Sequence, residues 1–299
     1  MRKIIIAGST KIVIDYNDII NLFLHTLNVY GLLGNHGLDY PLREDEAVKK
    51  SIDPKILEDV KEGDSYFSYG SLSIYEEGMN HIINNKIWEN LIDNSNIRMG
   101  VNQKNFGMAF EKCWNEFYKD YWQSSLTEKE KLFTECVNSF DFKEAAEKMR
   151  LASHREFPDN FFIFPAEALG HSALLFGNNI VMGNLEIGYD MGFVHEGLHL
   201  LLGEEWAKDP VIAGIMEKTD FRDEVYGSWK AKYEQALVVG LDCCIRRKDD
   251  LYAEKYHEGC GIGDLYTRSY PLIRNYYING CRGSIEDLMR ELILESEGV

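Results

Sequence analysis

Three side chains that can bind a metal or move a proton stand close together in "DMGFVHEGLHLLLG", residues 190–203. Apart from His195, Glu196 and His199, nearly every residue after Asp190 in this stretch is apolar or glycine. Burying two imidazoles and a carboxylate in an apolar helix is costly unless each finds a polar group to pair with. The stretch is therefore either a metal site or a core helix whose histidines are hydrogen-bonded to backbone or to buried carboxylates.

The spacing of these residues suits a metal ion. Side chains four residues apart stand one above the other on the same face of a helix. His195 and His199 can therefore bind one tetrahedral zinc ion, while Glu196 points beside the ion, where it can hold and deprotonate a metal-bound water. The same carboxylic acid can then pass its proton to a leaving amine. The pattern predicts hydrolysis of a carbonyl compound by zinc-bound hydroxide, with Glu196 as the general base.

A catalytic zinc site of this kind needs a third protein ligand and leaves the fourth position to water. Glu205 lies six residues after His199, where some zinc peptidases place a third ligand, but that arrangement needs a glycine at the position of Leu202. Glu224 follows an acidic stretch that we expect to be exposed. Neither of these two carboxylates is the favoured ligand.

Glu234 is the favoured third ligand because it lies on an apolar helical stripe. Val238, Leu241 and Ile245 follow it at intervals of four, three and four residues, which is the spacing of a buried helix face. A lone carboxylate on such a face needs a positive group, and a metal ion would supply one. The alternative is a buried glutamate paired with an arginine or with a backbone amide.

The motif and the elements around it resemble the zincin superfamily of metallopeptidases. The stretch "VHEGLHLLL", a helical glutamate after it and two short strands before it carry the resemblance over about residues 155–250, nearest the thermolysin-like gluzincins. The resemblance implies a zinc ion on His195, His199 and Glu234, and an edge strand in "GHSALLFG" that pairs with an extended peptide. This chain departs from the family because 34 residues separate His199 from Glu234, and because Val238 stands where thermolysin has a histidine-orienting aspartate.

Strand and helix signals alternate in the first half of the chain. Two β-branched runs at 3–7 and 11–15, separated by "GST", predict a hairpin. Asp18 is placed to cap the helix that follows. Further helices are expected at 54–62, 74–92 and 105–152.

The second half of the chain begins with strands. "DNFFIFPA" predicts one strand, and "HSALLFGNNIVMGN" predicts two strands around a turn. The motif helix comes next, with Asp190 as its N-cap and Gly203 at its C-terminal end. Two later helices are expected at 223–247 and 284–296, the second of them begun by Ser284.

This order of elements indicates an α+β fold, with a zincin-like catalytic domain at 151–299 after a mainly helical region at 1–150. The first region is expected to be a lobe that covers the substrate. The function predicted is that of a zinc-dependent metallopeptidase acting on peptides or proteins. The alternatives are a catalytically inert zincin-fold binding or regulatory module and a non-peptidase hydrolase that uses the same ion. The intact Glu196 disfavours the inert module, which would not need a general base.

Composition limits the expected partners and compartment. The chain of 299 residues is 45% hydrophobic and 12% aromatic, as folded proteins are, and its formal net charge is −17. A negative surface repels nucleic acid and anionic membranes, so neither is expected as a main partner. No stretch approaches the roughly 20 apolar residues of a membrane span, and the apolar run at the N-terminus is too short for an export signal. With six scattered cysteines expected to be free thiols, the sequence predicts a cytoplasmic protein.

Overall fold

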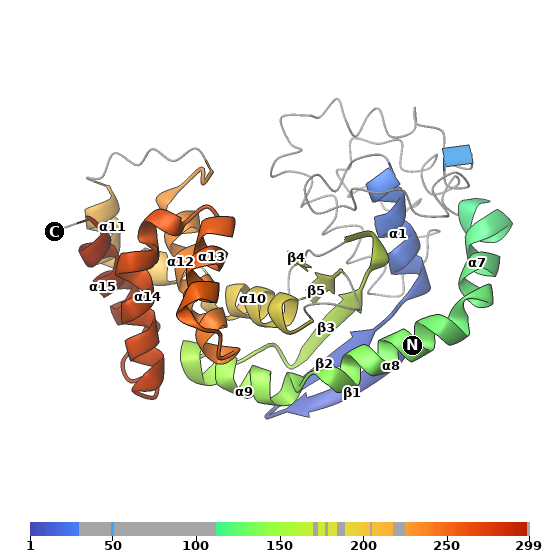
Figure 1. The fold of residues 1–299 in the computed structure, drawn as a ribbon, viewed down its shortest axis with the longest axis horizontal. Coiled ribbons are helices and arrows are strands. Elements are labelled where there is room, and N and C mark those ends of the chain that lie inside the picture. The colour runs from blue at the N-terminus through green and yellow to red at the C-terminus, as the bar shows by residue number, and fades with distance from the viewer. Residues whose placement is uncertain are drawn as a thin grey trace. The chain divides into compact units, whose positions relative to one another are not determined.

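The computed structural model describes residues 1–29, 49–50, 112–169, 173–176, 179–183, 189–203, 205–217 and 225–297 (Figure 1). The helices expected at 54–62 and 74–92 and the start of the one at 105–152 lie outside these residues. The fold is α+β, as predicted, with a small mixed sheet among helices. All six cysteines are free thiols. None of the described helices is long and apolar enough to cross a membrane.

In the described part of the chain, five strands form one sheet: β1 (Arg2–Ala7), β2 (Thr10–Asp15), β3 (Asn160–Pro165), β4 (Ala173–Phe176) and β5 (Asn179–Met182). Their order is β1-β2-β3-β5-β4. β3 runs parallel to β5, with Ile163 opposite Ile180, and β4 runs antiparallel to β5, with Leu174 opposite Val181. The strands expected in "DNFFIFPA" and "HSALLFGNNIVMGN" are confirmed, and β4 lies at an edge of the sheet, where "GHSALLFG" was expected.

The N-terminal hairpin is confirmed, and its turn depends on a glycine. β1 and β2 are neighbours in the sheet, and Gly8 between them has a φ of 62°, which glycine adopts without strain. Helix α1 (Asp18–Val29) follows them. Oδ1 of Asn17 accepts a hydrogen bond from the N–H of Ile20 at 3.1 Å and so caps this helix. The prediction that Asp18 is the cap is therefore wrong by one residue, because Asp18 already lies in the first turn.

The chain divides into two compact units, each built from separate segments. Unit 1 contains Met1–Ile4, Val13–Phe140 and Phe162–Tyr189. Unit 2 contains Ile5–Ile12, Asp141–Phe161 and Asp190–Val299. The motif of His195, Glu196 and His199, written HExxH, belongs to unit 2, as do the three carboxylates considered as a third ligand.

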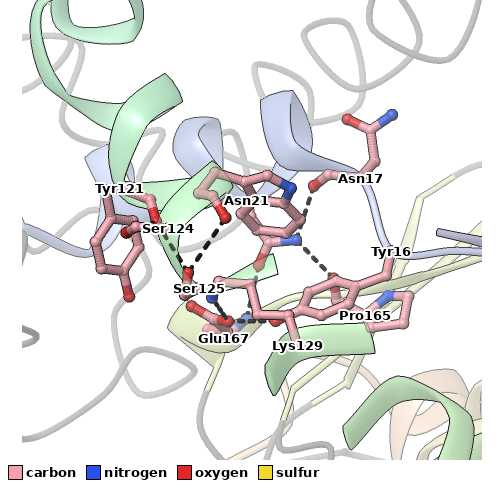
Figure 2. Close-up of polar contacts among 10 residues, drawn as sticks. Tyr16, Asn17, Asn21, Tyr121, Ser124, Ser125, Lys129, Pro165 and Glu167 are labelled. Atoms are coloured by element: carbon pink, nitrogen blue, oxygen red, sulfur yellow. Dashed lines mark hydrogen bonds and ion pairs between the residues drawn. The ribbon is translucent and has the colours of Figure 1, made fainter. Parts of the chain in front are cut away.

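Unit 1 buries a lysine. In its described residues, the helices besides α1 are η4 (Trp114–Tyr118), α7 (Lys119–Ser124), α8 (Leu126–Ser139) and the short η5 (Glu167–Leu169). Lys129 of α8 forms an ion pair with Glu167, and the hydroxyl of Tyr16 donates to the same carboxylate (Figure 2). The ammonium also lies 4.8 Å from the ring centroid of Trp122. Asn21 accepts a hydrogen bond from the N–H of Glu167 at 3.0 Å, so the network joins α1, α8 and η5.

Helix α12 is the central helix of unit 2. The helices that the structure describes in this unit are α9 (Phe142–Ser153), α10 (Tyr189–Leu202), η6 (Glu205–Lys208), α11 (Pro210–Met216), α12 (Trp229–Ile245), α13 (Asp250–Gly259), α14 (Gly263–Ile278) and α15 (Ile285–Glu297). α12 packs against α9, α13, α14 and α15, and α14 packs against α13 and α15 (Figure 1). Every residue of α12 from Ala236 to Ile245 is buried. The stripe that contains Val238, Leu241 and Ile245 is thus part of the core, as predicted.

The later helices differ in part from the sequence prediction. α12 begins at Trp229, after the predicted start near 223, because Oγ of Ser228 accepts a hydrogen bond from the N–H of Ala231 at 3.2 Å and caps the helix there. α13 and α14 occupy a stretch for which no helix was predicted. The final helix is confirmed, and Oγ of Ser284 accepts a backbone N–H of its first turn.

Replacing Gly240 by alanine is expected to destabilise the protein by about 1–3 kcal/mol. A Cβ at Gly240 of α12 would lie 2.6 Å from Cδ1 of Ile273 on α14, and both residues are buried. Gly214 of α11 is a matched control, because a Cβ there would meet nothing within 4 Å. Gly214→Ala is expected to leave stability unchanged or to raise it by about 0.5–1 kcal/mol. Urea unfolding measures the free energy of unfolding of both variants. An equal change in Gly240→Ala and Gly214→Ala would contradict close packing of α12 on α14.

Candidate functional site

The motif helix α10 ends where the sequence predicts but starts differently. It begins at Tyr189, so Asp190 lies inside the first turn and the prediction that Asp190 is the N-cap is wrong. Gly203 follows its last residue with a φ of 54°, and the N–H of Gly203 donates to the carbonyl of His199 at 3.1 Å. A left-handed glycine at this position is a common helix terminus.

The core holds α10 closely on the side away from the motif. The ring of Phe193 packs against those of Phe142 and Phe161, with centroids 5.1 and 6.1 Å away. Gly197 allows α9 to approach, because a Cβ at this position would lie 2.9 Å from Sδ of Met149. The motif side chains therefore project from a helix whose position is set by packing.

The two histidines lie on one face of α10. The ring centroids of His195 and His199 are 5.0 Å apart, as their spacing of four residues predicts. Both rings and the side chain of Glu196 are half-buried. The three polar residues of the motif thus lie at the margin of the core.

Helix α12 brings two polar side chains to these histidines. Nδ1 of His199 donates to Oε1 of Glu234 at 2.8 Å, and Nε2 of His199 donates to Oε1 of Gln235 at 3.1 Å. The amide nitrogen of Gln235 lies 3.3 Å from Nε2 of His195. Gln235 therefore contacts the Nε2 atoms of both rings, whereas Glu234 lies on the Nδ1 side of His199. The structure brings Glu234 into contact with the motif, and its role as third ligand stays a prediction.

Two residues of this cluster were missed by the sequence analysis. Gln235 follows Glu234 directly, and its position at the start of the buried part of α12 is the only local signal it carries. Tyr256 comes from α13, and its Oη lies 2.9 Å from Nδ1 of His195. Nothing in the sequence pattern joins Tyr256 to the motif, because α13 itself was not predicted.

Burial and neighbouring charges set the protonation of the motif. Burial lowers the pKa of His195 well below its usual range, and the charges of His199 and Arg246 lower it further. Burial also opposes the charged form of His199, but the hydrogen bond to Glu234 and the charges of Glu196 and Glu234 outweigh it and raise the pKa of His199. Burial raises the pKa of Glu196 to about 7, although the charge of His199 acts to lower it. Burial therefore favours the neutral form of His195, whereas the contacts of His199 favour its protonated form.

The side chains of the other two carboxylates considered as ligands are not among those that the structure describes. Glu205 is the first residue of η6, and Glu224 lies outside the described residues. Within the part of the chain that the structure describes, no three side chains of His, Cys, Asp or Glu are grouped so as to hold a metal ion. Hydrogen bonds link the side chains of His195, His199 and Glu234 instead. Glu234 bonds to His199 directly, and the amide of Gln235 bonds to both His195 and His199.

Comparison with known proteins does not identify a relative. No protein family, curated protein or solved structure matches the chain. The function is therefore inferred from the chemistry of the residues that α10, α12 and α13 bring into contact.

Proposed function

We propose that the protein is a zinc-dependent metallopeptidase that hydrolyses peptide bonds in peptides or proteins. The observation that supports this most is the 2.8 Å contact between His199 of the HExxH helix and Glu234 of α12. The spacing of the motif and the apolar stripe of α12 singled out these two residues separately, from different parts of the sequence. Their contact means that both side chains belong to one cluster, which a site built from both needs.

The donors in this cluster suit zinc. Imidazole nitrogen and carboxylate oxygen are the usual ligands of catalytic zinc, with one position left to water. Burial favours the neutral form of His195, whereas His199 has to lose its Nε2 proton before that nitrogen can bind an ion. Glu234 has to leave its hydrogen bond to Nδ1 of His199 in order to reach an ion bound at Nε2. Gln235 has to leave its contacts with the two Nε2 atoms when these bind an ion. Zinc binding is therefore expected to release protons and to move the Gln235 side chain.

Each motif residue has a defined role in this proposal. His195, His199 and Glu234 hold the ion, which supplies a water of lowered pKa and polarises the scissile carbonyl. Glu196 is not a ligand. Its carboxylate takes the proton from the attacking water and passes it to the leaving amine. Burial raises the pKa of Glu196 to about 7 in the metal-free protein, and the charge of a bound zinc ion would lower it and so favour the carboxylate that accepts the proton.

The same contacts favour a second candidate, a zincin-like module without an ion. All four ring nitrogens of His195 and His199 have protein groups within hydrogen-bonding distance. A buried polar network whose members are all satisfied stabilises a core without further ligands. In that case the motif helix would be structural, and the protein would act through binding alone.

Metal content separates the two candidates. Protein purified without chelators and then reloaded is expected to hold about one zinc ion per chain, because the proposed site binds a single ion. Glu234→Gln is expected to retain less zinc, since an amide is a weaker ligand than a carboxylate. Glu205→Gln and Glu224→Gln serve as controls and should bind zinc as the wild type does. Elemental analysis measures all four proteins.

Three outcomes of this measurement are decisive. Zinc in the wild type and the two controls, with loss in Glu234→Gln, supports the proposed site. Absence of zinc from the reloaded wild type would favour the module without an ion. Loss of zinc in Glu205→Gln or Glu224→Gln, with retention in Glu234→Gln, would show that the third ligand has been assigned to the wrong carboxylate.

A further inference from the structure

We propose that Tyr256 is the positioning residue of His195: its phenol oxygen accepts the Nδ1 proton and so leaves the Nε2 lone pair of His195 for the metal. This inference rests on the proposed function, because it assigns a role toward the zinc site. It concerns a residue of α13 that no part of the HExxH pattern includes.

Donors and acceptors around His195 determine which nitrogen carries the proton. An amide nitrogen can only donate, so Nε2 of His195 accepts the hydrogen bond from Gln235 at 3.3 Å and carries no proton. The imidazole is then neutral and has its proton on Nδ1. Nδ1 lies 2.9 Å from Oη of Tyr256 and donates to it. The contact with Tyr256 therefore selects the tautomer whose Nε2 lone pair faces the neighbouring histidine and Gln235.

A buried ion pair holds the ring of Tyr256 in place. Nε of Arg246 donates to Oδ1 of Asp242 at 2.7 Å, and the two side chains are 5% and 0% exposed. The guanidinium of Arg246 lies 5.9 Å from the ring centroid of Tyr256 and 5.4 Å from that of Tyr252. These distances are those of cation–π contacts. The position of the Tyr256 hydroxyl is thus fixed through α12 as well as through its own helix.

The rings of Tyr252 and Tyr256 both contact the guanidinium of Arg246, but their hydroxyls contact different groups. They lie one turn apart on α13, with ring centroids 5.9 Å apart. The hydroxyl of Tyr252 accepts a hydrogen bond from Arg246 at 2.9 Å, whereas that of Tyr256 accepts from His195. Tyr252→Phe is therefore a matched control. It removes a tyrosine hydroxyl that also lies on α13 and beside Arg246, but it leaves the contact between Tyr256 and His195 intact.

The expected effect follows from the role of groups that orient metal ligands. Such a group fixes the tautomer and the ring orientation of a ligating histidine, and its loss typically weakens metal binding 10- to 100-fold. Tyr256→Phe is expected to raise the zinc dissociation constant by about this factor. Tyr252→Phe is expected to change it less than about 3-fold, since it touches no ligand.

Two measurements on the full chain test the proposal. Competition with a chromophoric chelator gives the zinc dissociation constants of wild type, Tyr256→Phe and Tyr252→Phe, and thermal unfolding checks that each variant is folded. Nitrogen-15 NMR of the imidazoles in metal-free protein reports which nitrogen of His195 carries the proton. We expect the Nδ1–H form in the wild type and in Tyr252→Phe, and a shift toward Nε2–H in Tyr256→Phe.

The outcomes distinguish this inference from the proposed function. If the wild type binds no zinc, the proposed function fails whatever the tautomer is. If the wild type binds zinc and Tyr256→Phe binds it equally well, the inference fails and the proposed function stands. Should Tyr256→Phe not fold, the wild-type spectrum decides: Nδ1–H on His195 supports the inference, and Nε2–H overturns it.

Discussion

Replacing Glu196 by glutamine is expected to reduce peptide hydrolysis by about 10²- to 10⁴-fold, the contribution that general acid–base catalysis usually makes. Glutamine keeps the size of the side chain and most of its hydrogen bonding, but its amide cannot accept the proton of the attacking water. Zinc should stay bound, because Glu196 is not a ligand in the proposed site, and the fold should be unaffected. The measurement is a digest of a diverse peptide pool by zinc-loaded protein, followed by mass spectrometry.

Glu258→Gln is the matched control for this experiment. Glu258 is an exposed carboxylate on α13, in the same unit as the motif, and should be replaceable without loss of activity. Equal cleavage by the wild type and Glu196→Gln would mean that a contaminating protease or another mechanism is responsible. A wild type that holds zinc but cleaves nothing across a broad pool would contradict the peptidase and favour a binding module.

Replacing Lys129 by methionine is expected to destabilise the protein by about 2–4 kcal/mol, because removing one member of a buried ion pair leaves the other without compensation. The Lys129 side chain is 7% exposed, and that of Glu167 is 26% exposed. Methionine fills a similar volume, so the loss is mainly of charge and not of packing. The Trp122 ring also loses the cation that lies 4.8 Å from its centroid. Urea unfolding measures the change.

Lys131→Met on the same helix is the control for Lys129. Its ammonium lies 3.8 Å from Glu135, but the two side chains are 76% and 64% exposed. A surface pair of this kind contributes about 0–1 kcal/mol, so the control should unfold close to the wild type. A similar loss of unfolding free energy in Lys129→Met and Lys131→Met would contradict the view that burial makes the Lys129 ion pair more important for stability. A Lys129→Met protein as stable as the wild type would show that the pair only balances its own desolvation.

Local patterns were sufficient where the physical cause is local. The β-branched runs around Gly8 form the predicted hairpin, and the four-residue spacing of His195 and His199 places their rings together. The end of α10 at Gly203 and the start of α15 at Ser284 follow from backbone geometry and from capping, both of which act within a few residues. Of the two wrong caps, Asp18 is one position past the capping residue Asn17, and Asp190 is the second residue of α10. Helix starts are the least sharply defined part of a sequence pattern.

Helices α13 and α14 show where local patterns were not sufficient. α13 is largely polar, and α14 carries Pro271 within it. Both pack against α12 and against each other. Most helical stability in proteins comes from such packing and not from intrinsic propensity. A segment with a weak local helix pattern can therefore still form a helix. The missed helix α13 is also the reason that Tyr256 was missed.

By itself, the sequence of this protein determined an α+β fold, the position of the motif helix, and a stripe on which Glu234 needs a positively charged or proton-donating neighbour. Only the tertiary structure decided what that neighbour is: Nδ1 of His199, with Gln235 at both Nε2 atoms and Tyr256 at Nδ1 of His195. The physical reason is that periodicity and capping act within a few residues, whereas these contacts join helices distant in sequence. Their geometry follows from how α10, α12 and α13 pack.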